Sequence, residues 1–478
     1  MTTTPENTDV QDWVHRLHSY NGNNGNVLIM NGVDNVPTEH SPNLITSGGV
    51  FETERNIQER IDSVRNSLLG EYGGTYEPVY VFQIDTDESD PDAAVSYPVN
   101  CVNANFNHAT KDSLNDWANT FLGGIGACTL KEDGGINYWL DRANIFKKVD
   151  GTDAILTGAD GNVMVALPKM YWKTTIKVST WANTSIPASY KIETAISKGK
   201  FNNSVAWAHT MDGVEYPYVF VGVFQGLKNA DNKLTSVYSD AENPTVSQTN
   251  DNMQTYAANN GDGYSIVTWH TWSMINLISI LAYKTLDFQK AIGKGNCQTS
   301  AGLLLGTSYR AQAGGCSYGT QTNYDAMRIW YIENWFGDRW QQITGILKTE
   351  DNVFHINTAN CRFVKQTTAT AAVLAAAAAD HVAVASGFST SNGYISKFCG
   401  IDPFALLPAS VESGASNKYA CDYMWYAEGL RTVYVGGSWV NGACVGAFTF
   451  IASNAPSSAD TYRCARLQKI GTGVTAAA

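Results

Sequence analysis

The sequence has little charge and no basic region. Only 16% of its 478 residues are Asp, Glu, Lys or Arg, and the formal net charge is -12 with a pI near 5.1. A negative chain repels phosphate backbones and anionic lipid headgroups unless a local basic patch outweighs the net charge. The sequence contains no such patch, so we expect no nucleic-acid partner. Neutral ligands and other proteins fit this composition better.

Long apolar runs and a secretory signal are also missing. The N-terminus, MTTTPENTDVQDW, has neither the basic nor the apolar region of a signal peptide, which predicts synthesis in the cytoplasm without export. Residues 274–281 are the most apolar stretch and are too few to span a bilayer. The alanine-rich residues 369–385 are weakly hydrophobic and are interrupted by Asp380 and His381. We therefore expect no membrane insertion.

Motifs for disulfides, metals and cofactors are absent. Nine cysteines, an odd number, are spread from Cys101 to Cys464 without a CxxC pair, which argues against a disulfide framework and a zinc ribbon. No cysteine or acidic partner stands at ligand spacing from His15, His18, His209 or His270. No nucleophile elbow, phosphate-binding loop or dinucleotide fingerprint occurs. We expect no cofactor, no metal and no nucleophilic catalysis.

Two groups of acidic residues are candidates for chemistry. Residues 85–92, DTDESDPD, alternate oxygen ligands and suit a loose calcium site, although Asp90 and Ser96 stand where an EF-hand needs Gly and Glu. We favour a solvated acidic turn. Glu333 and Asp338 resemble the carboxylate pair of a glycoside hydrolase in an aromatic setting. Such acids are more often structural hydrogen-bond acceptors, and we favour that role over catalysis.

The first part of the chain predicts an arm followed by a helix. Residues 1–50 are polar and rich in Asn, Gly, Thr and Pro, as expected for an attachment arm. Within residues 51–73, alternating four- and three-residue steps predict a coiled-coil seam formed by Ile57, Ile61, Val64 and Leu68. Isoleucine at both seam positions favours three strands over two. We expect a homotrimer, assisted by neighbouring domains because so short a helix is marginal alone.

The rest of the chain predicts an α+β fold. Residues 74–160 are expected to form a β-rich intermediate domain, with an alternating strand at 79–84 and several Asp-Gly turns. A strand pair is predicted over residues 163–178 and a further strand over 218–225. The broad apolar face between Trp269 and about Gln289 predicts a core helix.

The last third of the chain has regular anchors around interchangeable residues. The anchors are VGGSW at 435–439, NG at 441–442, GAF at 446–448, NAP at 454–456 and CAR at 464–466. The residues between them are mainly Val, Ala, Thr, Phe, Ser and Tyr, whereas an active site needs a fixed set of acids, bases and nucleophiles. This pattern predicts a display surface that binds a partner.

Some of these segments resemble those of C-type-lectin-fold proteins. GGSW at 436–439, GDRWQ at 337–341 and the closing Arg466 are similar to motifs of two groups, the variable receptor-binding proteins of diversity-generating retroelements and the formylglycine-generating enzymes. The resemblance covers roughly residues 160–470 and implies a C-type-lectin-like domain over 161–478. The chain departs from the family pattern at three positions: Asp338 stands where the family usually has Asn, Gln341 where it has Glu, and Cys464 where it has Gly.

The resemblance also implies a set of receptor-binding residues. In the retroelement group the variable positions lie in the stretch that contains GGSW. Carried onto this chain, they are Tyr434, Val440, Ala443, Val445, Phe448, Phe450, Ser453, Ser457, Ser458, Asp460 and Tyr462. Turns held by Trp439, Pro456 and Arg466 would tolerate exchange of side chains that face solvent. Phe448 and Phe450 also alternate as in a strand, so one face can instead be core.

The enzyme group within this resemblance needs a close pair of reactive cysteines. Cys444 and Cys464 are the nearby candidates, and they lie in the display stretch without an enzymic motif. The calcium-dependent sugar motifs of animal lectins, EPN or QPD followed by WND, are absent. We therefore expect a binding protein, and any glycan that it binds would not need that metal.

The front of the chain resembles phage tail fibres, in which a phrase similar to SPNLITSGGV at residues 41–50 precedes a short trimerising helix. Together the resemblances imply a virion protein of the tail fibre or tail tip, synthesised in the host cytoplasm. Its arm and helix would bind phage tail or baseplate proteins. Its lectin-like domain would bind a bacterial surface receptor, a protein or a glycan, with diversification by a retroelement left open. The alternative is a tail-associated glycan depolymerase that uses Glu333 or Asp338.

Overall fold

The chain forms two compact units, Met1–Glu77 and Pro78–Ala478. The computed structural model describes residues 33–34, 44–45, 78–99, 120–177, 189–414 and 416–471. In the first unit β1 (Val33–Asp34) pairs in parallel with β2 (Leu44–Ile45). The predicted seam residues lie outside the described residues: Ile57, Ile61, Val64 and Leu68. The coiled coil and the trimer therefore stay predictions.

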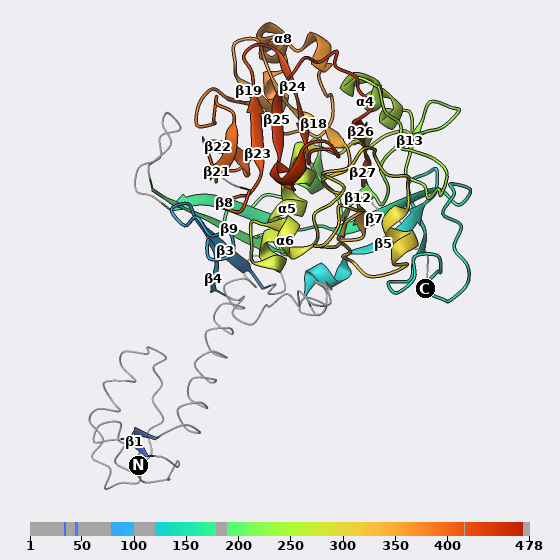
Figure 1. Ribbon diagram of the computed structural model, residues 1–478, viewed down its shortest axis with the longest axis horizontal. Helices are drawn as coiled ribbons and strands as arrows, with labels where there is room; N and C mark the ends of the chain where they lie inside the picture. Colours follow the sequence, from blue (N-terminus) through green and yellow to red (C-terminus); the bar gives the residue numbers. More distant parts are fainter. Residues whose placement is uncertain are drawn as a thin grey trace, which may run out of the picture. The chain divides into compact units, whose positions relative to one another are not determined.

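The second unit is β-rich with a few short helices (Figure 1). The alternating strand predicted at 79–84 is present as β3 (Tyr80–Asp85), whose Phe82 and Ile84 are buried while Val81 and Gln83 are partly exposed. It belongs to an antiparallel sheet with the order β4-β3-β9-β8, completed by β4 (Val95–Val99), β8 (Tyr171–Lys177) and β9 (Lys191–Ser197).

A six-stranded sheet has the order β15-β27-β12-β7-β5-β6. Its strands are β5 (Gly126–Leu130), β6 (Ile136–Trp139), β7 (Asn162–Pro168), β12 (Tyr218–Gly222), β15 (Tyr264–Ile266) and β27 (Leu467–Gly471). The strands predicted over 163–178 exist as β7 and β8, but they lie in different sheets. The six-stranded sheet continues across the domain boundary predicted at residue 160, because β5 and β6 are hydrogen-bonded to it.

A nine-stranded sheet forms the part of the unit that carries the predicted display stretch (Figure 1). Its order is β20-β19-β18-β24-β25-β23-β21-β22, and β26 pairs with β18 beside this path. The strands are β18 (Trp340–Lys348), β19 (Phe354–Asn357), β20 (His381–Val384), β21 (Gly393–Cys399), β22 (Leu407–Glu412), β23 (Tyr423–Tyr426), β24 (Arg431–Val435), β25 (Phe450–Asn454) and β26 (Arg463–Ala465). The β23–β25 and β18–β26 pairs are parallel.

The central helix α5 (Trp269–Tyr283) fills the space between two of these sheets. All 15 of its residues are buried, and it packs against both β18 and β3 (Figure 1). Thr268 caps its N-terminus by accepting a hydrogen bond from the Thr271 N–H. The predicted core helix is confirmed but is shorter than expected, because Lys284 adopts a left-handed conformation with φ 53° and ends it. A separate helix, α6 (Phe288–Ala291), follows.

The remaining described helices are short and lie outside the sheets: α4 (Asn250–Ala258), α7 (Thr307–Ala311) and α8 (Ala371–Ala376), with 3-10 turns η1 (Phe121–Gly124), η2 (Trp207–His209), η3 (Gln366–Thr368), η4 (Ala378–Asp380) and η5 (Gly442–Cys444). Two-residue strands pair as β10 (Thr210–Met211) with β11 (Val214–Glu215), β13 (Leu227–Lys228) with β14 (Leu234–Thr235), and β16 (Arg328–Ile329) with β17 (Ile332–Glu333). None of the helices in the described ranges has the length and apolarity needed to cross a membrane.

A buried carboxyl connects the four-stranded sheet to the nine-stranded sheet. Asp402 lies in the connection between β21 and β22, where it accepts hydrogen bonds from the indole N–H of Trp172 at 3.0 Å and from the backbone N–H of Thr174 at 2.9 Å. Both donors belong to β8. Burial raises the pKa of Asp402 to about 7, although these two hydrogen bonds act in the opposite direction.

We expect Asp402 to make stability depend on pH. Its pKa in the folded chain is higher than the ordinary aspartate value of 3.8, so its stabilising contribution is complete below about pH 4 and is lost as the pH rises through about 7. Asp402→Asn removes this titration. Urea unfolding measures the free energy of unfolding of both proteins. The value for the native chain minus that for the variant should fall by on the order of 2 kcal/mol between pH 5 and pH 8. A difference that does not change with pH would contradict the assignment.

Candidate functional site

The display stretch begins at a turn that only glycine can form. Gly436 and Gly437 follow β24 with φ values of 82° and 67°, in the left-handed region. A Cβ on Gly437 would lie 2.5 Å from a methyl carbon of Val445, and one on Gly436 would lie 3.1 Å from the carbonyl oxygen of Trp335. Conformation and close packing therefore both require the two glycines, and the backbone path into Trp439 is fixed.

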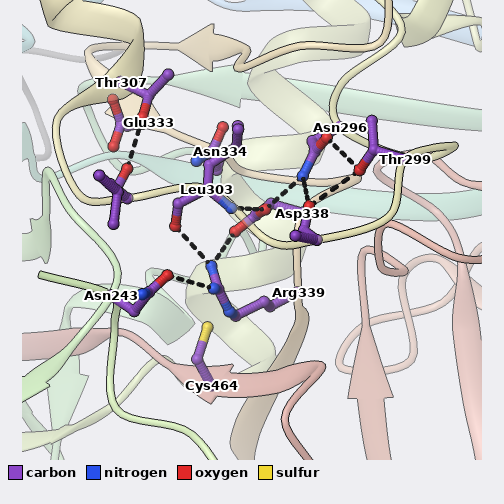
Figure 2. A network of polar contacts seen from close by, with 12 residues as sticks. Asn243, Asn296, Thr299, Leu303, Thr307, Glu333, Asn334, Asp338, Arg339 and Cys464 are labelled. Atoms are coloured by element: carbon purple, nitrogen blue, oxygen red, sulfur yellow. Dashed lines mark hydrogen bonds and ion pairs between the residues drawn. The ribbon is translucent and has the colours of Figure 1, made fainter.

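Beneath this turn lies a buried network around Asp338 and Arg339, which are 0% and 4% exposed (Figure 2). One carboxylate oxygen of Asp338 accepts from the Asn296 amide at 2.9 Å and from the Leu303 N–H at 2.8 Å, and the other is 2.6 Å from the Arg339 guanidinium. Arg339 also donates to the Leu303 carbonyl at 2.9 Å and to the Asn243 side chain at 3.0 Å. The two charges thus have polar partners in place of water.

The network holds the turn directly. The Trp439 N–H donates to the Asp338 carbonyl at 3.0 Å, and the Arg339 guanidinium lies 5.2 Å from the centre of the Trp439 ring. The Trp439 carbonyl in turn accepts from the Thr299 N–H at 2.9 Å. A Cβ on Gly302 would lie 2.4 Å from the Arg339 guanidinium carbon, so this neighbouring loop must also come close. The turn is therefore positioned by buried polar contacts rather than by its own exposed side chains.

Glu333 is a second buried acceptor and lies beside the closing arginine. Its carboxylate, 1% exposed, accepts from the Gly306 N–H and from the N–H and hydroxyl of Ser308, each at 2.7 Å. Burial raises the pKa of Glu333, and these hydrogen bonds oppose that effect. The fully buried Arg466 donates to the carbonyls of Gly222 and Val223 at 2.9 and 3.0 Å. Arg466 also donates to the Glu333 carbonyl at 2.6 Å.

The carboxylates of Glu333 and Asp338 are both engaged in contacts inside the protein. Neither carboxylate reaches the surface, and both accept hydrogen bonds from neighbouring backbone or side-chain donors. A glycosidase acid must protonate the leaving oxygen of a bound sugar, which requires access to substrate. Of the two interpretations drawn from the sequence, the structural acceptor agrees with these contacts.

The acidic residues 85–92 have partners within the protein. Asp85 accepts from the Asp87 N–H at 3.1 Å and pairs with Lys191 at 3.0 Å, while Asp90 accepts from the Asp92 and Ala93 N–H groups at 2.8 and 3.2 Å. Across the described ranges, no group of three or more His, Cys, Asp or Glu side chains is arranged to hold a metal ion. The favoured interpretation as an acidic turn agrees with these contacts.

The two candidate reactive cysteines occupy different surroundings. Cys464 is fully buried in β26, and burial raises the pKa of its thiol to about 12. Cys444 is partly exposed in η5, and burial raises its pKa to about 11. Both are thiols rather than thiolates at neutral pH, which is the unreactive form of cysteine.

The eleven residues predicted for receptor binding do not share one environment. The exposed and partly exposed ones are Val440, Ala443, Ser453, Ser457, Ser458, Asp460 and Tyr462, and we call these seven the turn surface. Neighbouring residues contact two members of this surface. Arg463 lies 2.8 Å from Asp460 and also donates to Asn454 at 2.7 Å. The Tyr462 ring contacts Trp439 at 6.3 Å between centres.

The other four predicted residues are part of the core, and this corrects the predicted surface: Tyr434, Val445, Phe448 and Phe450. Phe450 faces inward from β25 with its ring 6.1 Å from that of Trp269, and Phe448 lies 5.1 Å from Phe288. The Arg463 guanidinium covers Tyr434 at 4.8 Å from its ring centre. These side chains are inaccessible to a receptor.

A further surface feature was not predicted from the sequence. Tyr394, Tyr423 and Trp425 are partly exposed, and with the more buried Trp340 they form a continuous group that we call the aromatic row. Successive ring centres are separated by 5.2 Å, 4.5 Å and 5.6 Å. The segment YMWY in β23 carries a weak signal for it, because its alternation places Tyr423 and Trp425 on one face.

The buried ion pair gives a stability prediction. Asp338→Ala leaves the Arg339 guanidinium buried without its counter-ion, and we expect the free energy of unfolding to fall by about 3–5 kcal/mol. Lys147→Ala is the control, because its ion pair with Asp153 joins side chains that are 42% and 86% exposed, and its loss should cost less than about 1 kcal/mol. Urea unfolding followed by tryptophan fluorescence measures both. Equal losses of unfolding free energy in the two variants would contradict the stabilising role assigned to the Asp338–Arg339 pair.

Comparison with known proteins adds no assignment. A scan against protein-family models gave no match, and a search of curated proteins found no similar sequence. Function is therefore inferred from the turn surface, the polar network beneath it and the sequence motifs.

Proposed function

We propose that this chain is a phage or prophage tail-fibre adhesin that binds a bacterial surface receptor, a protein or a glycan, through the turn surface. The observation that carries the proposal is the contrast between the two layers of the site. The exposed layer holds small, hydroxyl and aliphatic side chains such as Val440, Ala443 and Ser457. The layer beneath holds the backbone by the buried Asp338–Arg339 pair. Side chains on such a turn can change without loss of the fold, as receptor recognition requires.

The domain proposed to carry this surface is a C-type-lectin-like domain over residues 161–478. Two observations support this proposal, although β5 and β6, which precede residue 161, complete the sheet that holds the two ends of the segment. Its first strand β7 and its last strand β27 flank β12 in one sheet, so the beginning and end of the segment lie together. The GGSW turn at 436–439 is anchored by the GDRWQ segment at 337–341, the two motifs that carry the resemblance.

Trimerisation through the predicted helix completes the proposal. Three copies of one site on a fibre raise the effective concentration of the second and third binding events, so each site can bind weakly and still hold a cell. The N-terminal arm would bind tail or baseplate proteins, in the virion. Individually weak sites also leave room for change at positions such as Val440.

The depolymerase alternative finds less support in the described residues. Its two candidate acids, Glu333 and Asp338, are 1% and 0% exposed and are engaged in internal hydrogen bonds. Loss of polymer length when purified chain is added to capsule or lipopolysaccharide, abolished by Glu333→Gln, would nevertheless overturn the adhesin proposal in favour of the depolymerase.

A matched pair of substitutions tests the binding surface. Val440 is 62% exposed, and Val440→Glu should weaken labelling of bacteria by fluorescent full-length protein at least about tenfold, because a charge would be desolvated at the interface. Val149, 68% exposed and outside the turn surface, provides the control Val149→Glu, which should label normally. Flow cytometry over a panel of strains measures both.

Two results would contradict the proposal. Native protein that labels no strain in a panel from several bacterial phyla is not an adhesin for bacteria. Equal loss of labelling in the Val440→Glu and Val149→Glu proteins would mean that binding does not use the turn surface.

The oligomeric state is a separate prediction. Light scattering coupled to size exclusion should give the full chain three times its 51.9 kDa mass, and a chain beginning at Gly74 should be monomeric. The truncated chain lacks the predicted seam from Ile57 to Leu68 and keeps the compact unit Pro78–Ala478. A monomer in both cases would rule out the trimeric fibre.

A further inference from the structure

We infer that the aromatic row is a binding platform for a neutral oligosaccharide and continues the receptor site beyond the turn surface. The inference rests on the proposed function and narrows it, because it selects a glycan as the receptor class. It adds Tyr394, Tyr423 and Trp425, which lie before the stretch that the motifs indicated.

Three of the four rings of the row lie on the neighbouring strands β21 and β23 of the nine-stranded sheet, and the fourth, Trp340, lies on β18, which is separated from β23 by β25 and β24. Tyr394 on β21 is directly opposite Tyr423 on β23, and Trp425 is directly opposite Ile451 on β25. In β23 the alternation is strict, with Tyr423 and Trp425 partly exposed and Met424 and Tyr426 buried. Neighbouring positions on paired strands share a face, so these side chains project outward together.

The row meets the turn surface at Trp340. The ring centres of Trp340 and Trp425 are 5.6 Å apart, and the backbone N–H of Trp340 donates to the Tyr462 carbonyl at 2.9 Å. A ligand that covers the row therefore also reaches the turn surface.

The chemistry of the row fits the flat face of a sugar ring. The π face of an aromatic ring is negative, and the C–H groups on one face of a pyranose are slightly positive, so the two surfaces stack. Tyrosine and tryptophan also offer polar edges to the sugar hydroxyls and lose little conformational entropy when they bind. Several rings in continuous contact provide more than one stacking position, which favours an oligosaccharide over a single sugar.

The charges around the row select a neutral ligand. Glu412, which is directly opposite Tyr394 on β22, is exposed at one end of the row. Asp460 is partly exposed at the other end, and the nearby Arg463 guanidinium is already engaged with Asp460 and Asn454. Carboxylates accept hydrogen bonds from sugar hydroxyls but repel carboxylated or phosphorylated glycans. The net charge of -12 acts in the same direction.

Titration of the full-length chain with defined polysaccharides tests the inference. The probes are neutral dextran, mannan and galactan fragments, with galacturonic acid oligomers as the charged comparison, and tryptophan fluorescence and calorimetry report binding. We expect at least one neutral probe to bind and the charged probe not to bind. Trp425→Leu should weaken the neutral ligand at least about tenfold, whereas Trp425→Phe, which keeps an aromatic face, should stay within about threefold.

Tyr256→Ala is the matched control, because Tyr256 is a partly exposed aromatic residue on α4 outside the row. It should bind as the native chain does. Binding of no neutral probe, equal binding of the charged probe, or native affinity in Trp425→Leu would overturn the inference. Melting temperatures of the variants show that loss of binding is not loss of folding.

Bacterial labelling separates this inference from the proposed function. If Trp425→Leu labels cells normally while Val440→Glu does not, the row has no role and the adhesin proposal stands. If protease treatment of the cells abolishes labelling and neutral glycans do not compete, the receptor is a protein and the inference is wrong. If native chain labels no strain, the adhesin proposal itself fails, whatever the titrations show.

Discussion

The surface proposed for binding depends on the buried ion pair of Asp338 and Arg339. Two charges removed from water are tolerated only when nearby polar groups replace the lost hydration, and here the side chains of Asn296 and Asn243 and the backbone of Leu303 do so. The same two residues hold the Trp439 turn. Because the support is internal, the exposed side chains of the turn contribute little to its geometry and are available for recognition.

The parts of the fold that could be predicted from sequence are those in which the residues of a single helix or strand carry a clear pattern. Alternation identified β3, and the broad apolar face identified α5, all of whose residues are buried because the helix packs against strands of two sheets. The end of α5 was not predictable, since Lys284 adopts a left-handed conformation that other residue types more often occupy. The partners of β7 and β8 also could not be predicted, because pairing depends on strands distant in sequence.

The candidate site shows the same division. Anchors such as Gly436 and Trp439 were identified because their residue types are restrictive. The inward direction of Phe450 follows from the register of β25 with β24 and β23, and the sequence alone does not contain that register. Tyr394 and Trp425 were missed for a related reason: each is ordinary in its own strand, and only the sheet brings them into one row. A group of side chains contributed by several strands can be recognised only when the pairing of those strands is known.

The position of β27 (Leu467–Gly471) inside its sheet has a consequence for biosynthesis. It is inserted between β15 and β12, and the Arg466 side chain just before it satisfies carbonyl groups more than 130 residues earlier in the chain. While these residues have not yet emerged from the ribosome, the sheet lacks the strand between β15 and β12, and the carbonyl groups that Arg466 would bind have no partner from it. A chain that ends early in the display stretch therefore lacks both β27 and Arg466, and we expect it to be less stable than the full chain and more open to degradation.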